Sequence, residues 1–123
     1  MANKIAIIAD DLTGAADAVV PFLKNGWRCG VDWEFDGRTP TELDAIALDT
    51  ETRELTSEHH DLIAHRVRCA AGYAIAAASS IVYKKIDSTL RGNLALELAA
   101  LREGLPGRIA IICPAFPDNG SIQ

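Results

Sequence analysis

The chain has 123 residues, of which 49% are hydrophobic and 24% charged, and twelve Lys and Arg oppose seventeen Asp and Glu. This length suffices for one hydrophobic core and is short for two ordinary domains, and the aliphatic content is too high for a disordered chain. The formal net charge of −5 argues against a broad nucleic-acid or membrane footprint, which needs a basic excess. Any basic residues that bind a ligand must therefore be confined to a small part of the surface.

Cysteine usage and the lengths of the apolar runs indicate the compartment. Cys29, Cys69 and Cys113 are widely spaced and form no CxxC or Cys/His ligand pattern, so we interpret them as buried thiols of a reducing compartment. The longest apolar run, Ile5 to Ala9, is too short for a membrane span or a signal peptide. We expect a cytoplasmic protein with no metal site in this chain and no nucleic-acid or membrane partner.

Apolar runs alternate with helical patterns along the chain. The predicted strands cover residues 5–9, 28–33, 45–48, 81–86 and 109–113. The first predicted helix covers residues 15–24, and Pro21 should kink or shorten it. The second can be capped by Thr56 or Ser57 and keeps helical apolar spacing from Leu62 to Ala78. The third runs from Leu94 to Gly104. This alternation predicts an α/β fold of three layers, with a mostly parallel sheet flanked by helices.

Polar or unusual segments directly follow four of the predicted strands. They are Asp10 and Asp11, residues 49–53, residues 87–91, and residues 114–116. Ligands of parallel α/β sheets bind beyond the carboxyl ends of the strands. We therefore expect these four segments to share one edge of the sheet.

Asp10 and Asp11 form an adjacent acidic pair at the end of a buried strand. Such carboxylates accept hydrogen bonds from substrate hydroxyls, hold Mg²⁺ or act as a base. The alternative is that Asp11 caps the first helix while Asp10 is solvated, which explains one carboxylate and not two. Thr13 and Gly14 suit a tight turn with close backbone approach. Neither GxxxxGK[ST] nor GxGxxG occurs anywhere in the chain.

The segment from Lys84 to Asn93 joins a predicted strand to a predicted helix start. Its charged groups, hydroxyls and glycine stand where backbone N–H groups and the helix dipole favour an anion. Strand alternation allows only one of Lys84 and Lys85 to face the site. The alternative is a helix with Ser88 or Thr89 as its N-cap and solvated charges around it. Capping requires only one of these polar residues, so it does not explain five of them. The segment therefore predicts a binding site for a small, anionic, hydroxylated molecule.

Arg53 follows the third predicted strand. The planar guanidinium offers two parallel hydrogen bonds to a carboxylate, which a lysine does not. An exposed loop arginine paired with Glu51 or Glu54 is equally compatible with the sequence.

Two motifs carry a family resemblance: Ile8-Ala9-Asp10-Asp11-Leu12-Thr13-Gly14-Ala15 and Lys85-Ile86-Asp87-Ser88-Thr89-Leu90-Arg91-Gly92-Asn93. Together they resemble the N-terminal domain of the four-carbon acid sugar kinases, and Asp49–Arg53 and Cys113–Pro117 resemble weaker motifs of that family. The family phosphorylates sugar acids such as threonate or erythronate with ATP. Its N-terminal domain binds the sugar acid, and a separate C-terminal domain carries the nucleotide site. The resemblance implies that residues 1–123 are a partial N-terminal substrate-binding domain without the nucleotide domain, which would bind most of the ATP and Mg²⁺.

The resemblance also implies roles for individual residues. Arg91, helped by Lys85 and Arg53, would hold the substrate carboxylate. The catalytic candidates are Asp10, Asp11 and Asp87. They would accept hydrogen bonds from the substrate hydroxyls, and one of them would take the proton of the reacting hydroxyl. The other substrate-binding candidates are Thr13, Gly14, Ser88, Thr89 and Gly92. The implied partners are a small sugar acid and ATP, and a homodimer is an open alternative.

Three rival functions fit parts of the sequence. A phosphoacceptor receiver domain has acids after its first and third strands, but it needs a lysine after strand five, where residues 113–116 offer none. A haloacid-dehalogenase-type phosphatase needs Asp-x-Asp-x-Thr, and this chain has Asp-Asp-Leu-Thr. A sugar-acid-binding module without chemistry is the third alternative.

Overall fold

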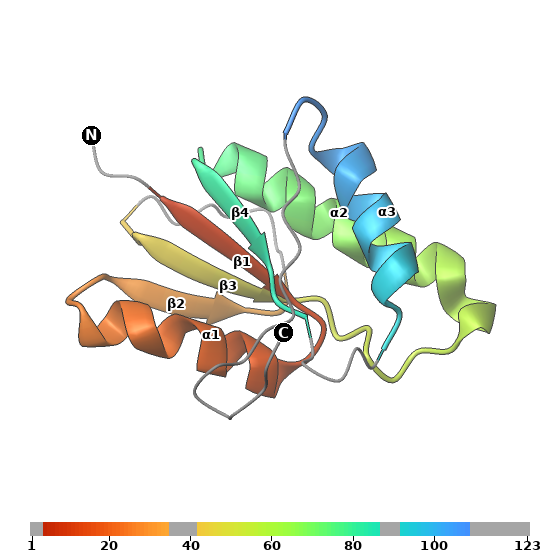
Figure 1. The fold of residues 1–123 in the computed structure, drawn as a ribbon, viewed down its shortest axis with the longest axis horizontal. Helices are drawn as coiled ribbons and strands as arrows, with labels where there is room; N and C mark the ends of the chain where they lie inside the picture. Colours follow the sequence, from red (N-terminus) through yellow and green to blue (C-terminus); the bar gives the residue numbers. More distant parts are fainter. Residues whose placement is uncertain (1–3, 35–41, 87–91, 109–123) are drawn as a thin grey trace, which may run out of the picture.

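A computed structural model describes residues 4–34, 42–86 and 92–108, in which strands and helices alternate along the chain (Figure 1). The strands of this part of the chain are β1 (Ile5–Ala9), β2 (Cys29–Asp32), β3 (Ala45–Asp49) and β4 (Ile81–Lys84). The helices are α1 (Leu12–Lys24), α2 (His60–Ala76) and α3 (Leu94–Gly104), with a 3-10 turn η1 (Ser57–His59) before α2. The predicted strand at 109–113 lies outside the described residues.

The sheet is parallel at every described pairing and has the strand order β2-β3-β1-β4. Ile5 of β1 pairs with Ala45 on one side and with Ile81 on the other, so the carboxyl ends of the strands lie at one edge. Helix α1 covers one face of the sheet, and α2 and α3 cover the other (Figure 1). The predicted α/β class with three layers is confirmed.

Side chains of the central strands alternate between two hydrophobic cores. Ala6 and Ile8 of β1 pack in the core formed with α2 and α3, and Ile7 and Ala9 pack in the core formed with α1. All four side chains are buried. This alternation explains the continuous apolar run in the sequence, because a strand covered on both faces needs apolar residues at every position.

Helix boundaries differ from the sequence-based expectation at two places. Helix α1 begins at Leu12 rather than Ala15, and it is not shortened by Pro21, because it continues to Lys24. The predicted side-chain cap of α2 at Thr56 or Ser57 is wrong, since a 3-10 turn precedes α2. The helix starts at His60, behind the N-cap residue His59, whose side chain makes no capping hydrogen bond to the helix. Local 3-10 turns of this kind are common at helix starts and leave little trace in hydrophobic periodicity.

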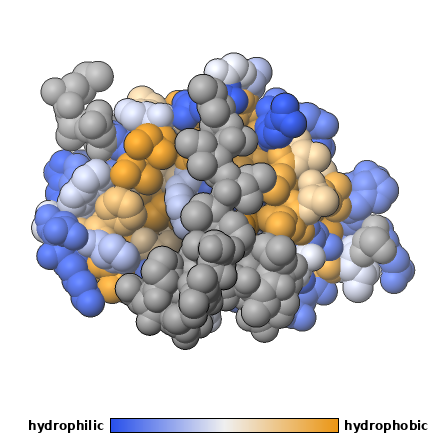
Figure 2. All heavy atoms as spheres, viewed as in Figure 1, coloured by the Kyte–Doolittle hydropathy of each residue, from blue (hydrophilic) through white to orange (hydrophobic). Residues whose placement is uncertain are grey.

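Some cysteine and aromatic side chains reach the surface of the protein. Cys69 is exposed and Cys29 is intermediate, so the expectation of buried thiols is wrong for Cys69, while Cys113 lies outside the described residues. Trp33 is about half exposed, whereas Phe22 and Trp27 pack together with their ring centroids 5.1 Å apart. Figure 2 shows apolar atoms at the surface on both sides of the atoms drawn in grey. In the described ranges no helix is long and apolar enough to cross a bilayer.

Candidate functional site

The loop after β3 is hydrogen-bonded onto the end of β1. The backbone N–H of Thr50 donates to the Ala9 carbonyl at 2.9 Å, and those of Thr52 and Arg53 both donate to the Asp10 carbonyl at 3.0 Å. The Thr50 hydroxyl donates to the same Ala9 carbonyl at 3.1 Å and lies 2.7 Å from the Thr52 hydroxyl. Two of the four strand ends that we expected at one edge are therefore joined directly.

Arg53 and Asp10 form a two-pronged ion pair at this edge. Arg53 Nε lies 3.2 Å from Asp10 Oδ2 and Nη2 lies 2.8 Å from Oδ1, and the two side chains are only 16% and 8% exposed. Arg53 Nη1 also lies 3.3 Å from Asp11 Oδ2. The two aspartates thus hold the guanidinium, and the alternative of an exposed arginine paired with Glu51 or Glu54 is wrong. Asp10 is buried, so the alternative of a solvated Asp10 is wrong.

Asp11 also serves as the N-cap of α1. Its Oδ1 accepts from the Gly14 N–H at 2.8 Å, so the capping alternative is correct for this residue. A Cβ atom at Gly14 would lie 2.7 Å from Asp11 Oδ1 and 3.8 Å from Lys85 Cγ. The predicted close approach at Gly14 is therefore present, and the stem of Lys85 lies beside it. Thr13 is exposed in the first turn of α1.

Gly92, near the C-terminal end of the predicted binding segment Lys84–Asn93, lies against the Arg53–Asp10 ion pair. A Cβ atom there would lie 2.7 Å from Asp10 Oδ2 and 3.9 Å from Arg53 Cγ, and the φ angle of +92° already favours glycine. The remaining candidates of this segment, Asp87, Ser88, Thr89 and Arg91, lie outside the described residues. Helix α3 has Asn93 as its N-cap, so the alternative of a cap at Ser88 or Thr89 is wrong.

Lys84 and Lys85 lie toward opposite layers, as strand alternation predicts. Lys84 Nζ lies 3.2 Å from Glu97 Oε1 on α3, whereas the Lys85 stem lies beside Gly14 on α1. Lys85 Nζ donates to the Ile86 carbonyl at 3.1 Å. Of the two lysines, Lys85 is thus the one on the side of the Asp11 cap.

A cleft of about 240 Å³ opens at this edge of the sheet. Five carboxylates and one guanidinium line it together with an apolar residue; the lining residues are Asp10, Asp11, Leu12, Asp49, Glu51, Arg53 and Glu54. Burial raises the pKa of Asp49, the neighbouring Glu51, Asp11 and Asp10 charges raise it further, and a hydrogen bond from the Glu51 N–H opposes them. Carboxylates in such a cleft suit a ligand with several hydroxyl donors.

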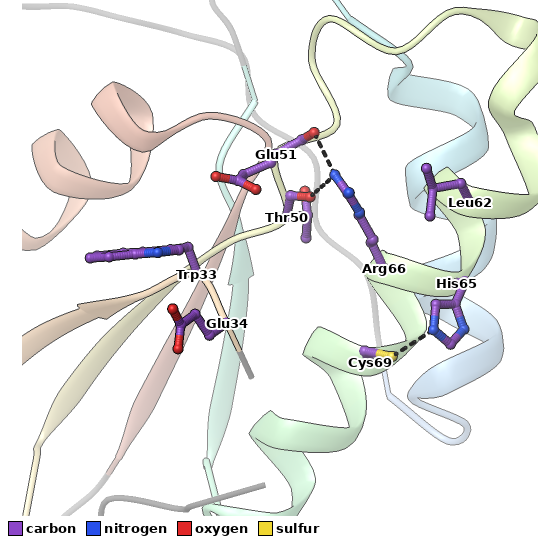
Figure 3. Close-up of a pocket in the computed structure, with 8 residues that line it drawn as sticks. All are labelled: Trp33, Glu34, Thr50, Glu51, Leu62, His65, Arg66 and Cys69. Carbon is purple, nitrogen blue, oxygen red and sulfur yellow. Dashed lines mark hydrogen bonds between the residues drawn. The ribbon is translucent and has the colours of Figure 1, made fainter. Parts of the chain in front are cut away.

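A second cavity, of about 320 Å³, adjoins the first one across Glu51, which lines both (Figure 3). In this cavity Arg66 of α2 donates to the carbonyls of Thr50 at 3.4 Å and Glu51 at 3.0 Å. Glu51 has a positive φ of 55°, a conformation that costs a non-glycine residue energy and needs support from its surroundings. Arg66 thus supports the loop from the α2 side, while Asp10 binds it at the sheet edge.

Asp49 and Asn93 were not among the expected site residues. Asp49 was recognised only as a strand-end acid, and its position at the end of β3 was the available clue. Asn93 donates from Nδ2 to the carbonyls of Thr52 and Leu55, both at 2.9 Å, and nothing in the sequence reveals these contacts. Within the described ranges, no group of three or more His, Cys, Asp or Glu side chains is arranged to hold a metal ion.

Comparison with known families decides between the alternatives left open by the sequence. Residues 5–123 match the family described as the sugar-binding N-terminal domain. The chain belongs to this family. The resemblance found in the motifs is confirmed, and the receiver-domain and phosphatase alternatives have no support.

Curated relatives of the chain are sugar-acid kinases. The chain is 41% identical to a D-threonate kinase of Cupriavidus necator over 93% of its own length and 26% of the relative's length. It is 34% identical to a D-erythronate kinase of Heliobacterium modesticaldum, covering 98% of this chain and 28% of that protein. The chain thus spans little more than a quarter of the relatives it matches.

A solved structure shares the fold. It is a domain of unknown function from Bordetella bronchiseptica, crystallised as a domain-swapped dimer with bound citrate. This structure superposes with a TM-score of 0.79 at 32% identity, over 98% of this chain and 31% of that one.

Proposed function

We propose that this chain is the sugar-acid-binding part of a kinase that transfers a phosphoryl group from ATP to a hydroxyl of a four-carbon sugar acid. The observation that carries the proposal is the cleft at the carboxyl edge of the sheet, where Asp10 and Asp11 hold Arg53 among further carboxylates. The family and the kinase names of its relatives support the same function.

The carboxylates of the cleft would bind the hydroxyl groups of the sugar acid. Asp10 and Asp11 are ion-paired with Arg53, so their carboxylate oxygens are held in position as acceptors. Among the carboxyls that line the cleft, Asp49 has a pKa that burial raises, which suits it to receive the proton of the reacting hydroxyl. Phosphoryl transfer depends mostly on positioning and charge stabilisation, and a rigid set of acceptors supplies the positioning.

The carboxylate of the sugar acid needs a cation, and the acidic cleft alone would repel it. Lys85 lies on the Asp11 side of the site, beside the N-terminus of α1. We propose that Arg91 and Lys85 receive the carboxylate, with Arg53 helping, and that the positive end of the α1 dipole contributes. Asp87, Ser88, Thr89, Thr13, Gly14 and Gly92 complete the proposed substrate site.

We further propose that ATP and Mg²⁺ are bound mainly by another domain, since the chain spans about a quarter of its kinase relatives and carries no phosphate-loop motif. We also propose a cytoplasmic location, where ATP is available as the phosphoryl donor. A homodimer is the proposed assembly, because the similar structure is a dimer. That structure also binds citrate, a hydroxylated carboxylate of the chemical kind proposed here.

The test is a transfer assay with the intact protein that contains this chain. D-threonate, D-erythronate and their L-isomers would be incubated with ATP, and threitol, which keeps the hydroxyls but lacks the carboxylate, serves as the matched control. We expect phosphorylated product from at least one acid and none from threitol. Asp10→Asn should lower kcat/KM by about 100-fold or more, the range expected for a group that positions or deprotonates the reacting hydroxyl. Binding without transfer would favour the non-catalytic module, and neither binding nor transfer would overturn the proposal.

A further inference from the structure

One peptide group joins helix α2 to the carboxylate of Asp49 in the cleft. Its N–H, that of Glu51, donates to Asp49 Oδ1 at 2.8 Å. Its carbonyl, that of Thr50, accepts from Arg66 Nη1 at 3.4 Å. The same nitrogen donates to the next carbonyl, that of Glu51, at 3.0 Å (Figure 3). Arg66 therefore holds both peptide groups that flank the Cα atom of Glu51, and through one of them it acts on Asp49.

The backbone at Glu51 needs this support. Its φ angle of 55° is a left-handed conformation, which is disfavoured for a residue with a Cβ atom. The side chains of Thr50 and Thr52, on either side of Glu51, are buried, so the chain has little freedom to shift as a whole. A rotation of the Thr50–Glu51 peptide group would relieve the conformation, and it would turn the Glu51 N–H away from Asp49. The guanidinium of Arg66 opposes this rotation, because its hydrogen bonds to the two carbonyls would be lost.

Asp49 lies among other carboxylates, so a hydrogen bond to its ionised form matters. The charged groups that line the cleft with it come from the end of β1, the start of α1 and the loop after β3; they are Asp10, Asp11, Glu51, Arg53 and Glu54. On the neighbouring strand β2, Asp32 is in register with Leu48 and therefore points to the opposite face of the sheet from Asp49. Helix α2 contributes Arg66.

The Glu51 N–H counteracts the surroundings of Asp49. Burial raises the pKa of Asp49, the hydrogen bond from this N–H opposes the rise, and the neighbouring carboxylates raise the pKa further. Loss of the hydrogen bond would therefore raise the pKa of Asp49 more.

We propose that Arg66 is a positioning residue of the sugar-acid site, which holds the Thr50–Glu51 peptide group so that its N–H stays on the carboxylate of Asp49. The catalytic consequence rests on the proposed function, in which Asp49 receives the proton of the reacting hydroxyl. The fixing of the peptide group is independent of that function. Both hydrogen bonds come from one nitrogen, so Arg66→Lys can keep a donor for them, whereas Arg66→Met cannot.

Steady-state kinetics of the intact protein give the first test. The matched control is Arg68→Met, because Arg68 lies on the same helix in an exposed pair with Glu103 at 3.6 Å. Arg66→Met should lower kcat by about tenfold or more and leave KM for ATP within about twofold, since misplacing a general base costs part of its contribution and does not touch the nucleotide. Arg66→Lys should recover most of this loss, and Arg68→Met should match the wild type. A kcat of Arg66→Met within about twofold of the wild type, the size expected of an exposed charge, would overturn the proposal.

The pH dependence of kcat/KM separates positioning from a general loss of structure. A base acts only when it is ionised, so activity falls on the acid side as Asp49 takes up a proton. Without the Glu51 N–H the pKa of Asp49 rises, and the acid limb of Arg66→Met should move to higher pH by about 0.5–1 pH unit. Arg66→Lys should keep the wild-type limb. A purely structural role would lower activity at every pH alike and leave the limb in place, which would also overturn the proposal.

Amide hydrogen exchange measures the fixing of the peptide group without any activity. Peptides that cover residues 50–55 should exchange about tenfold faster or more in Arg66→Met than in the wild type or in Arg66→Lys, because the loop opens more easily. Arg66→Gln, whose side chain is too short to reach the loop, replaces Arg66→Met if that variant does not fold. Unchanged exchange would refute the positioning role. Faster exchange in a protein that phosphorylates no sugar acid would refute the proposed function alone.

Discussion

Gly92→Ala is the substitution for which the structure makes the sharpest statement. Gly92 has a φ of +92°, and a Cβ atom there would lie 2.7 Å from Asp10 Oδ2. The methyl group therefore brings two costs, one from the left-handed backbone and one from the collision with a carboxylate. Gly26 separates the two, because its φ is +82° and a Cβ atom there meets nothing within 4 Å.

Both alanine variants should lose about 1–2 kcal/mol of unfolding free energy from the backbone conformation. Only Gly92→Ala forces Asp10 to move, and Asp10 is held by Arg53 Nε at 3.2 Å and Nη2 at 2.8 Å. A displaced Asp10 would lose its proposed hydrogen bond from a substrate hydroxyl. A charge-assisted hydrogen bond is worth about 1.5–3 kcal/mol, so its loss corresponds to roughly tenfold or more in substrate affinity.

The assay compares thermal unfolding and sugar-acid kinetics of the two variants in the intact protein. We expect both variants to lose Tm, Gly92→Ala more than Gly26→Ala because of the added collision with Asp10, and a fall of about tenfold or more in kcat/KM for Gly92→Ala alone. Equal kinetic constants in Gly92→Ala and Gly26→Ala would refute the placement of Gly92 against a functional Asp10.

Three further predictions concern the cleft and the chain as a whole. Arg53→Lys keeps the charge and loses the fork that binds Asp10, so KM for the sugar acid should rise roughly tenfold, and steady-state kinetics with an unchanged KM would count against this role. Because burial raises the pKa of Asp49, its ionisation destabilises the fold as the pH rises above the ordinary pKa range of an aspartate. Asp49→Asn should therefore raise Tm at neutral pH, and this gain should disappear in acid below that range. A difference in Tm that does not depend on pH would contradict the raised pKa of Asp49. The 123-residue chain alone should transfer no phosphoryl group from ATP to threonate, and measurable product from the purified chain would show that it holds its own nucleotide site.

The sheet and the location of the site could be predicted because both follow from the pattern of elements. Alternating strands and helices require parallel strands, and parallel strands bring Asp10 and the residues after Asp49 to one edge. The pairing of Arg53 with Asp10 could not be predicted, because these residues are 43 positions apart and their contact depends on the exact path of the loop.

Buried polar residues were the main features that the sequence concealed. Glu97 lies between Leu94 and Leu98 in a helical pattern where a glutamate ordinarily faces solvent, and its burial becomes intelligible only next to Lys84. Thr50 and Thr52 are likewise buried through contacts with Ala9 and with each other. Such contacts depend on tertiary packing, and hydrophobic periodicity carries no information about them.

Binding of sugar acids without ATP tests the central claim most directly. Calorimetric titration of the intact protein with D-threonate and D-erythronate, with threitol as the reference ligand, separates sugar-acid recognition from phosphoryl transfer. The account predicts that at least one acid binds, that threitol does not, and that Asp10→Asn weakens the binding of that acid by about tenfold or more. Equal binding of threitol and the acids, or binding that does not depend on Asp10, would contradict it.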